Sequence, residues 1–165
     1  MKILSKQKNS RMCMICGLDN EYGVNAPFYN MEDGSVMTVF RYKEQHQSYP
    51  GRVHGDEMGL RSLWAKELSE ETFGVTISLD TKYRKPVPYE TELIGRGVVV
   101  KNTSHFIITD SYIMDKDGEI LANGRIKYIK MDTQKIQEGV EVHEEMPYLV
   151  EDGRTEIEGP FFDNL

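Results

Sequence analysis

An acidic pair follows directly on a His-Gly step in the first half of the chain. His54 and Gly55 precede Asp56 and Glu57, with no residue between the two pairs. A carboxylate in such a place can act as a general base or as a nucleophile toward an activated carbonyl. Acidic residues are also typical of the first turn of a helix, where the helix dipole stabilises negative charge. Both interpretations stay open on these residues alone.

A second candidate for chemistry is the C-x-x-C pair, Cys13 and Cys16. It can supply half of a zinc site that is completed across a dimer or by a histidine. It can act as a redox dithiol, although no thioredoxin-like βαβ pattern accompanies it. It can also be two ordinary cysteines in an N-terminal turn. We favour the last interpretation, because two ligands alone are a weak signal for a metal.

The net charge of −7 is concentrated toward the C-terminal end. Residues 133–165 hold nine acidic residues against Lys135 and Arg154, so this stretch alone accounts for −7. Such a tail argues against nucleic acid as the main partner, since phosphate backbones bind basic surfaces. We expect the tail to be solvated and partly disordered.

The length of 165 residues suits one domain with a core of ordinary size. No stretch approaches the ~20 apolar residues that span a membrane. The basic start of the sequence lacks the apolar stretch of a secretory signal. We therefore expect a cytoplasmic protein that has no membrane partner.

Apolar periodicity predicts one helix and five strands. Residues 56–68 repeat apolar side chains near the helical period of about 3.6 residues. Alternation of apolar and polar residues predicts a strand at 75–83, and 34–42, 91–101, 105–115 and 119–130 are also predicted as strands. The last four follow one another closely, so we expect an antiparallel meander that curls around the single helix, an α+β arrangement. Residues 115–118, Asp-Lys-Asp-Gly, are typical of a hairpin turn.

Two sequence motifs carry a family resemblance. Residues 47–55 read QSYPGRVHG and residues 81–88 read TKYRKPVP. The first resembles the loop that leads into the central helix of PaaI-like acyl-CoA thioesterases and ends in His-Gly-Gly. The second resembles the strand end that follows in the same family, and the Cys-x-x-Cys-Gly start at 13–17 resembles one of its branches. The likeness covers most of residues 13–131.

The resemblance implies a hotdog fold, in which a curved antiparallel sheet of about five or six strands wraps around one central helix. On this basis we divide the chain into three regions. Residues 1–20 are an N-terminal segment with the cysteine pair, residues 21–132 are the hotdog domain, and residues 133–165 are the acidic tail.

The sequence departs from the family pattern at the acid pair. In the family several small or apolar residues separate His-Gly-Gly from the acids, whereas Gly55 runs directly into Asp56. Without a gap the acid position falls on Leu63 or Trp64, and the acid is lost. A gap of about seven residues keeps the helix face, because seven residues make nearly two turns. We favour the gap, and we hypothesise that the sequence lacks a short segment at this junction.

Thioester hydrolysis requires a polarised carbonyl, an attacking water or carboxylate, and a leaving thiolate. The resemblance implies that Asp56 is the general base or nucleophile, with Glu57 as the second choice. Gly55 lets the carbonyl approach the amides at the helix N-terminus. His54 hydrogen-bonds near the oxyanion or orients the loop. In related proteins the acid and the loop come from different subunits, so the resemblance implies a homodimer or a dimer of dimers.

The substrate implied is an acyl-CoA or a similar thioester, and no metal or cofactor is expected. Candidates for substrate binding are Gln47, Tyr49, Lys82, Arg84, Lys85, Asn102 and Ser104. Their basic members suit the phosphates of coenzyme A, although they can equally be charges that protect a solvated strand edge. Because fold does not fix function, a non-catalytic hotdog protein that binds acyl thioesters as a sensor or scaffold is the alternative.

Overall fold

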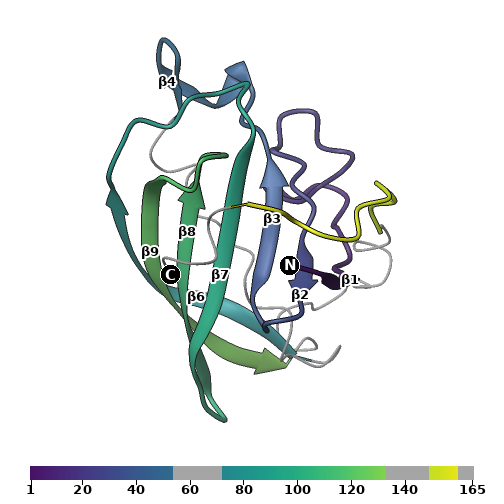
Figure 1. Ribbon diagram of the computed structural model, residues 1–165. Coiled ribbons are helices and arrows are strands. Elements are labelled where there is room, and N and C mark those ends of the chain that lie inside the picture. Colours follow the sequence, from purple (N-terminus) through teal and green to yellow (C-terminus); the bar gives the residue numbers. More distant parts are fainter. Residues whose placement is uncertain (54–71, 133–148, 160–165) are drawn as a thin grey trace.

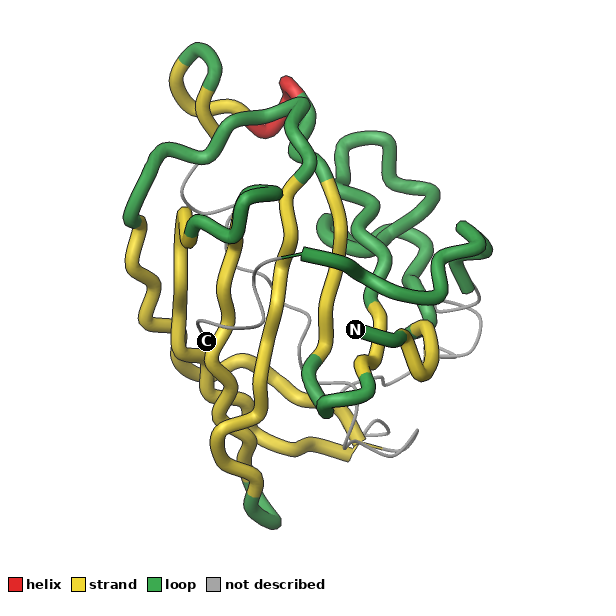
Figure 2. Tube along the Cα trace, in the orientation of Figure 1, coloured by secondary structure: helices red, strands yellow, loops and turns green. Residues whose placement is uncertain are grey.

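The computed structural model describes residues 1–53, 72–132 and 149–159 (Figure 1). Its strands are β1 Ile3–Lys6, β2 Tyr29–Met31, β3 Val36–Phe40, β4 Gln47–Tyr49, β5 Arg52–Val53, β6 Thr72–Tyr83, β7 Leu93–Asn102, β8 Phe106–Met114 and β9 Ile120–Asp132. The one helical element in this described part is a 3-10 turn, η1 Glu44–His46 (Figure 2). The helix predicted at 56–68 and the junction between Gly55 and Asp56 lie outside it. Within these ranges, no helix has the length and apolar character needed to cross a membrane.

Seven strands form one antiparallel sheet in the order β1-β2-β3-β7-β8-β9-β6, and β4 and β5 form a separate hairpin. All five predicted strands are present, and the antiparallel sheet is confirmed. The strand number exceeds the prediction because β1 and β2 were missed. They have four and three residues, which is too short for an alternating pattern to stand out.

The predicted meander is wrong for its first strand. β6 pairs with β9, from Thr72 opposite Asp132 to Tyr83 opposite Ala122, and not with β7. The connection 84–92 contains two prolines, which disfavour a tight hairpin. It runs over one end of the sheet before β7 begins (Figure 1). The meander therefore consists of β7, β8 and β9, and β6 is left at the edge.

Each face of the sheet carries its own apolar cluster. Val36, Phe40 and Ile113 are buried on one face, which we call the Val36 face. Met37 and Met114 are buried on the opposite face, the Met37 face. Side chains alternate between the faces along a strand, so neighbouring residues such as Val36 and Met37 enter different clusters. The central strands are consequently covered on both sides near β3.

The Val36 face is open at its β6 end. Ile77, Leu79 and Tyr83 are 54%, 50% and 56% exposed. The alternating pattern of this strand predicts a half-buried face, and the exposed fractions are higher than that pattern suggests. Among the described residues, no strand pairs with the outer edge of β6.

Part of the acidic tail lies on the Met37 face. Residues 149–159, which we call the docked segment, cross in front of β2 and β3 (yellow in Figure 1). Ile157 is buried in the Met37 cluster, and Glu156 forms a β-bridge with Lys2. This part of the tail, which the sequence analysis expects to be solvated, is therefore packed on the sheet.

Candidate functional site

The loop after β3 is fixed by a buried histidine. His46 Nδ1 accepts a hydrogen bond of 2.9 Å from the Lys43 amide, and its Nε2 lies 2.7 Å from the Tyr22 carbonyl oxygen. Both contacts require a neutral ring with its proton on Nε2. The ring also packs edge-on against Tyr42, with 5.8 Å between the centroids. Sequence reasoning missed His46, because no local pattern distinguishes a buried histidine from a loop histidine.

Three asparagines brace the N-terminal loop that supports this histidine. Asn9 donates its side-chain amide to the carbonyls of Cys16 and Ala26, and Asn20 donates to Met12. The Asn25 side-chain nitrogen donates to the Gly17 and Asn20 carbonyls, and its side-chain oxygen accepts a hydrogen bond from the Lys43 ammonium. Asparagine amides thus satisfy backbone carbonyls where no strand can. The loop and the segment containing His46 consequently form one braced unit.

The cysteine pair sits in a tight turn of the same loop. The Gly17 amide donates to the Cys13 carbonyl at 2.8 Å, and a Cβ on Gly17 would lie 2.4 Å from that oxygen. The hydrogen bond with the Cys13 thiol and then burial raise the pKa of Cys16. A thiol held in its protonated form is a poor nucleophile and a poor metal ligand. The residues described hold no group of three or more metal-ligating side chains. A zinc site completed by a second copy of the chain stays open.

The braced loop ends at Val53, directly before the predicted catalytic residues. The Val53 amide donates to the Val87 carbonyl at 3.0 Å, and its side chain is buried in the Val36 cluster. His54, Gly55, Asp56 and Glu57 lie outside the described residues, so their roles stay predictions. Val53, the residue before them in the chain, is nevertheless fixed at the rim of the sheet.

Gln47 and Tyr49 lie on β4 and are exposed. Their strand pairs with β5 in a short hairpin, and Gly51 at its turn has a φ of 79°. Figure 2 places this hairpin at the end of the sheet beside η1. Neither side chain contacts the apolar clusters, so their predicted place in a thioester pocket would require a covering element.

The predicted basic residues Lys82, Arg84 and Lys85 lie at the end of β6 and just after it. Lys82 lines a shallow hollow on the Met37 face together with Asp80, Asp110 and Arg125. Arg125 donates two hydrogen bonds of 2.7 Å to Asp110. The hollow therefore carries as many carboxylates as cations. This balance does not favour an anion there.

Arg84 and Lys85 each have a side-chain partner, and that of Arg84, Asn123, also lines the hollow at Lys82. Arg84 Nε donates to Asn123 Oδ1 at 2.7 Å, and Lys85 forms an ion pair with Glu119. Their backbone amides both donate to the Leu121 carbonyl. These contacts fix the strand end after β6, and they make both residues structural as well as basic.

A second basic group surrounds the β7–β8 turn, which contains Ser104 and follows Asn102. The ammonium groups of Lys101 and Lys127 lie 5.5 Å and 4.6 Å from the centre of the Phe106 ring. Both lysines pair opposite Ile108 in the sheet, so they share the Met37 face. Sequence reasoning missed Lys127, because only the pairing of β8 with β9 brings it to this turn.

Comparisons with solved structures place this architecture. A thioesterase superfamily protein superposes with a TM-score of 0.58 at 21% identity, over 72% of this chain and 60% of its own. A phenylacetic acid degradation-related protein from Ralstonia eutropha gives a TM-score of 0.58 at 16% identity, over 64% of this chain and 85% of its own. The chain shares the hotdog-type fold of these structures. This confirms the antiparallel sheet that the motif resemblance implies, while the central helix predicted at 56–68 lies outside the described residues.

A third hotdog structure of this kind, a Bacillus halodurans protein solved with CoA, gives a TM-score of 0.54 at 20% identity, over 63% of this chain and 72% of its own. The sequence itself matches no family model and no curated protein. The hotdog chain spans less than two thirds of the first of these structures. At these identities the comparisons establish the fold and leave the residues of the site to be argued from this chain.

Proposed function

We propose that this hotdog protein is a thioesterase that hydrolyses an acyl-CoA or a related thioester. The observation that supports this most directly is the anchoring of Val53. In a fold shared with thioesterases, its bond to Val87 fixes the last described residue before the His-Gly-Asp-Glu sequence at one rim of the sheet. His46 and the asparagine-braced loop hold that rim in place. A fixed approach to reacting groups is what positional catalysis requires.

The proposed reaction uses Asp56 as a general base. Asp56 takes a proton from water, the hydroxide attacks the thioester carbonyl, and the tetrahedral intermediate collapses by breaking its C–S bond. The proton then goes to the leaving thiolate, which gives a free thiol and a carboxylic acid. Backbone amides after Gly55, with His54 nearby, would stabilise the oxyanion. Glu57 is the second choice for the base.

We place the phosphates of CoA at the β7–β8 turn of the partner subunit, because within one chain this turn lies at the opposite end of β7 from Val53 and the β4–β5 hairpin (Figure 1). Lys101 and Lys127 put two ammonium groups beside one ring, next to Asn102 and Ser104. The hollow at Lys82 is the weaker location, because Asp80 and Asp110 balance its cations. Tyr49 and Gln47 would contact the pantetheine arm once a partner subunit covers them.

The proposed partner of the chain is a second copy of itself. β6 has an outer edge that is unpaired within the described chain, and apolar side chains are exposed beside it. Unpaired edges of this kind are templates for pairing with another strand. A two-fold axis at this edge would join two sheets into one.

A thiol-release assay with a panel of acyl-CoAs tests the proposed activity. We expect saturable release of CoA thiol with at least one member of the panel. Saturable binding of the acyl-CoAs without turnover, measured by calorimetry on the same preparation, would instead support the sensor or scaffold alternative. A protein that shows no binding and no turnover with any acyl-CoA would contradict both the thioesterase and the sensor or scaffold function.

The phosphate location makes a separate prediction. Replacing Lys101 and Lys127 together by alanine should raise the KM for acyl-CoA about tenfold, since losing two charge-assisted contacts costs at least 1.4 kcal/mol. The KM for the matching acyl-pantetheine, which has no nucleotide phosphates, should stay unchanged. Lys116→Ala, in the hairpin turn between β8 and β9, removes a comparable exposed charge and serves as control. Equal rises in KM for acyl-CoA and acyl-pantetheine would contradict the proposal that this turn binds the phosphates.

A further inference from the structure

The docked segment extends the sheet beyond β1. The Ile3 amide donates to the Thr155 carbonyl at 2.9 Å, and the Ile157 amide donates to the Met1 carbonyl at 3.0 Å. The Met1 amino group returns a hydrogen bond of 2.9 Å to the Ile157 carbonyl. With the antiparallel bridge between Lys2 and Glu156, these bonds make the segment behave like an added strand. Pairing of an extended peptide with an open sheet edge is a common mode of peptide recognition.

One apolar side chain of the segment enters the Met37 cluster. Ile157 is 2% exposed and packs with Met31, Met37 and Met114 among others. Methionine side chains are flexible and adapt to the shape of what they contact. The neighbours of Ile157 in the segment are exposed. The packing of this part of the segment therefore depends on a single buried side chain.

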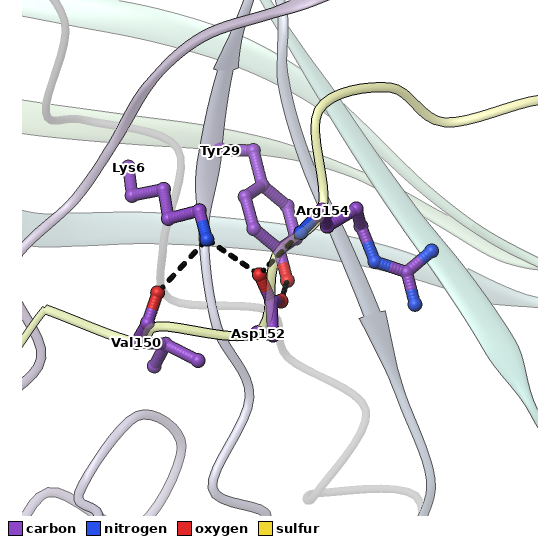
Figure 3. Close-up of polar contacts among 5 residues, drawn as sticks. All are labelled: Lys6, Tyr29, Val150, Asp152 and Arg154. Atoms are coloured by element: carbon purple, nitrogen blue, oxygen red, sulfur yellow. Dashed lines mark hydrogen bonds and ion pairs between the residues drawn. The ribbon is translucent and has the colours of Figure 1, made fainter.

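A carboxylate holds the other end of the segment. Asp152 lies 2.5 Å from the Lys6 ammonium and accepts a hydrogen bond from the phenol of Tyr29, which is 1% exposed (Figure 3). Lys6 also donates to the Val150 carbonyl at 3.0 Å, and the Arg154 amide donates to Asp152 at 3.0 Å. The buried Tyr29 phenol thus has its acceptor supplied by the tail.

The electrostatics of this contact favour an ionised carboxylate. Burial and then the hydrogen bond to Asp152 raise the pKa of the Tyr29 phenol. Desolvation acts to raise the pKa of Asp152, but the hydrogen bonds from Lys6 and Tyr29 outweigh it and lower that pKa to about 2. Both contacts therefore stabilise the charged form of Asp152.

We propose that the β1 edge and the Met37 cluster form a peptide-binding groove, and that residues 149–159 are its ligand in cis. The groove recognises an extended segment with an aspartate at one position and a branched apolar residue five positions later. Lys6 and Tyr29 bind the carboxylate, and the Met37 cluster packs against the apolar side chain. β1 and Met1 hydrogen-bond the backbone of the segment.

The proposed occupant of the groove is the chain's own tail, because residues 133–148 tether it to the same molecule. Sixteen residues, 133–148, separate the end of β9 from the segment. At up to about 3.3 Å per residue such a linker can span roughly 50 Å, enough to return across a small domain. A tethered ligand has an effective concentration on the order of millimolar. A free peptide of the same sequence must compete with the tethered segment at this effective concentration.

The test uses full-length protein and a fluorescent peptide of residues 149–159. In the variant Asp152→Asn/Ile157→Asp the tethered segment is weakened and the groove is left intact. We expect the labelled peptide to bind this variant saturably, and the wild-type chain at least tenfold more weakly. A peptide that carries both changes should bind neither. Equal binding to the two proteins, or binding to neither, would overturn the proposal.

A matched control and a second measurement keep the result interpretable. Glu151→Gln/Glu158→Gln changes two exposed neighbours and should bind the peptide as weakly as wild type does. In wild-type protein, hydrogen exchange at the Ile3 and Ile157 amides should proceed together and faster than at β8. Exchange of both amides only with the whole sheet would show a fused strand and no separable ligand. Concentration-dependent exchange of labelled segments between copies would overturn occupancy in cis.

Discussion

Replacing Asp56 by alanine should reduce the turnover of the best acyl-CoA substrate by at least a hundredfold. General acid–base catalysis contributes about 10²–10⁴-fold, and the loss should fall on kcat because the proposed base acts in the transition state. Asp56→Asn should give nearly the same loss, since the amide keeps the shape and lacks the basicity. Turnover in the thiol-release assay, with the oligomeric mass measured alongside, checks the prediction.

The neighbouring acid provides the control for this prediction. Glu57→Gln should lower kcat less than about tenfold if Glu57 only complements the helix dipole, a contribution of about 0.3–1 kcal/mol. A large loss in Glu57→Gln with full activity in Asp56→Ala would exchange the two assignments. Full activity in both variants would contradict a carboxylate base at this sequence and reopen the ungapped alignment, in which no acid occupies the position.

Much of the sheet could be predicted from local patterns. β3, β7, β8 and β9 carry β-branched and aromatic residues between turn residues, so they can be assigned as strands before any pairing is known. The turn between β8 and β9 was also predictable, because Gly118 supplies the φ of 82° that the hairpin needs. These features depend on residues close together in the chain.

The rest depends on contacts between distant residues. β6 has a strand pattern, but its place beside β9 depends on where the connection 84–92 leads. Tyr29 and Asp152 are 123 positions apart, and nothing in either local sequence indicates their hydrogen bond. His46 is likewise defined by its contacts with Tyr22 and Lys43. The candidate site has the same property, since the motif predicts its chemistry while its anchoring at Val53 depends on Val87.

The β6 edge carries the other large effect that we expect. If two copies pair along this edge, Ile77 and Leu79 lie at the contact, and their exposed fractions of 54% and 50% in the single chain are buried in the dimer. Burial of apolar area at roughly 25 cal/mol per Å² favours that association. Leu79 pairs opposite Ile126, and Ile77 is the bulge residue two positions before it. Their replacement should therefore act on the dimer more than on the monomer.

The double variant Ile77→Lys/Leu79→Lys should be monomeric at micromolar concentration and at least a hundredfold less active. Exposed substitutions usually change the stability of a single chain by only about 0.5 kcal/mol, whereas four like charges would face one another across a two-fold axis. Because the acid and the loop of one site are proposed to come from different subunits, activity should fall with the dimer and recover at high protein concentration. Val100→Lys, on the half-exposed bulge of β7, changes a comparable apolar side chain away from this edge. It should leave sedimentation and turnover unchanged, while a double variant that stays dimeric would move the interface elsewhere.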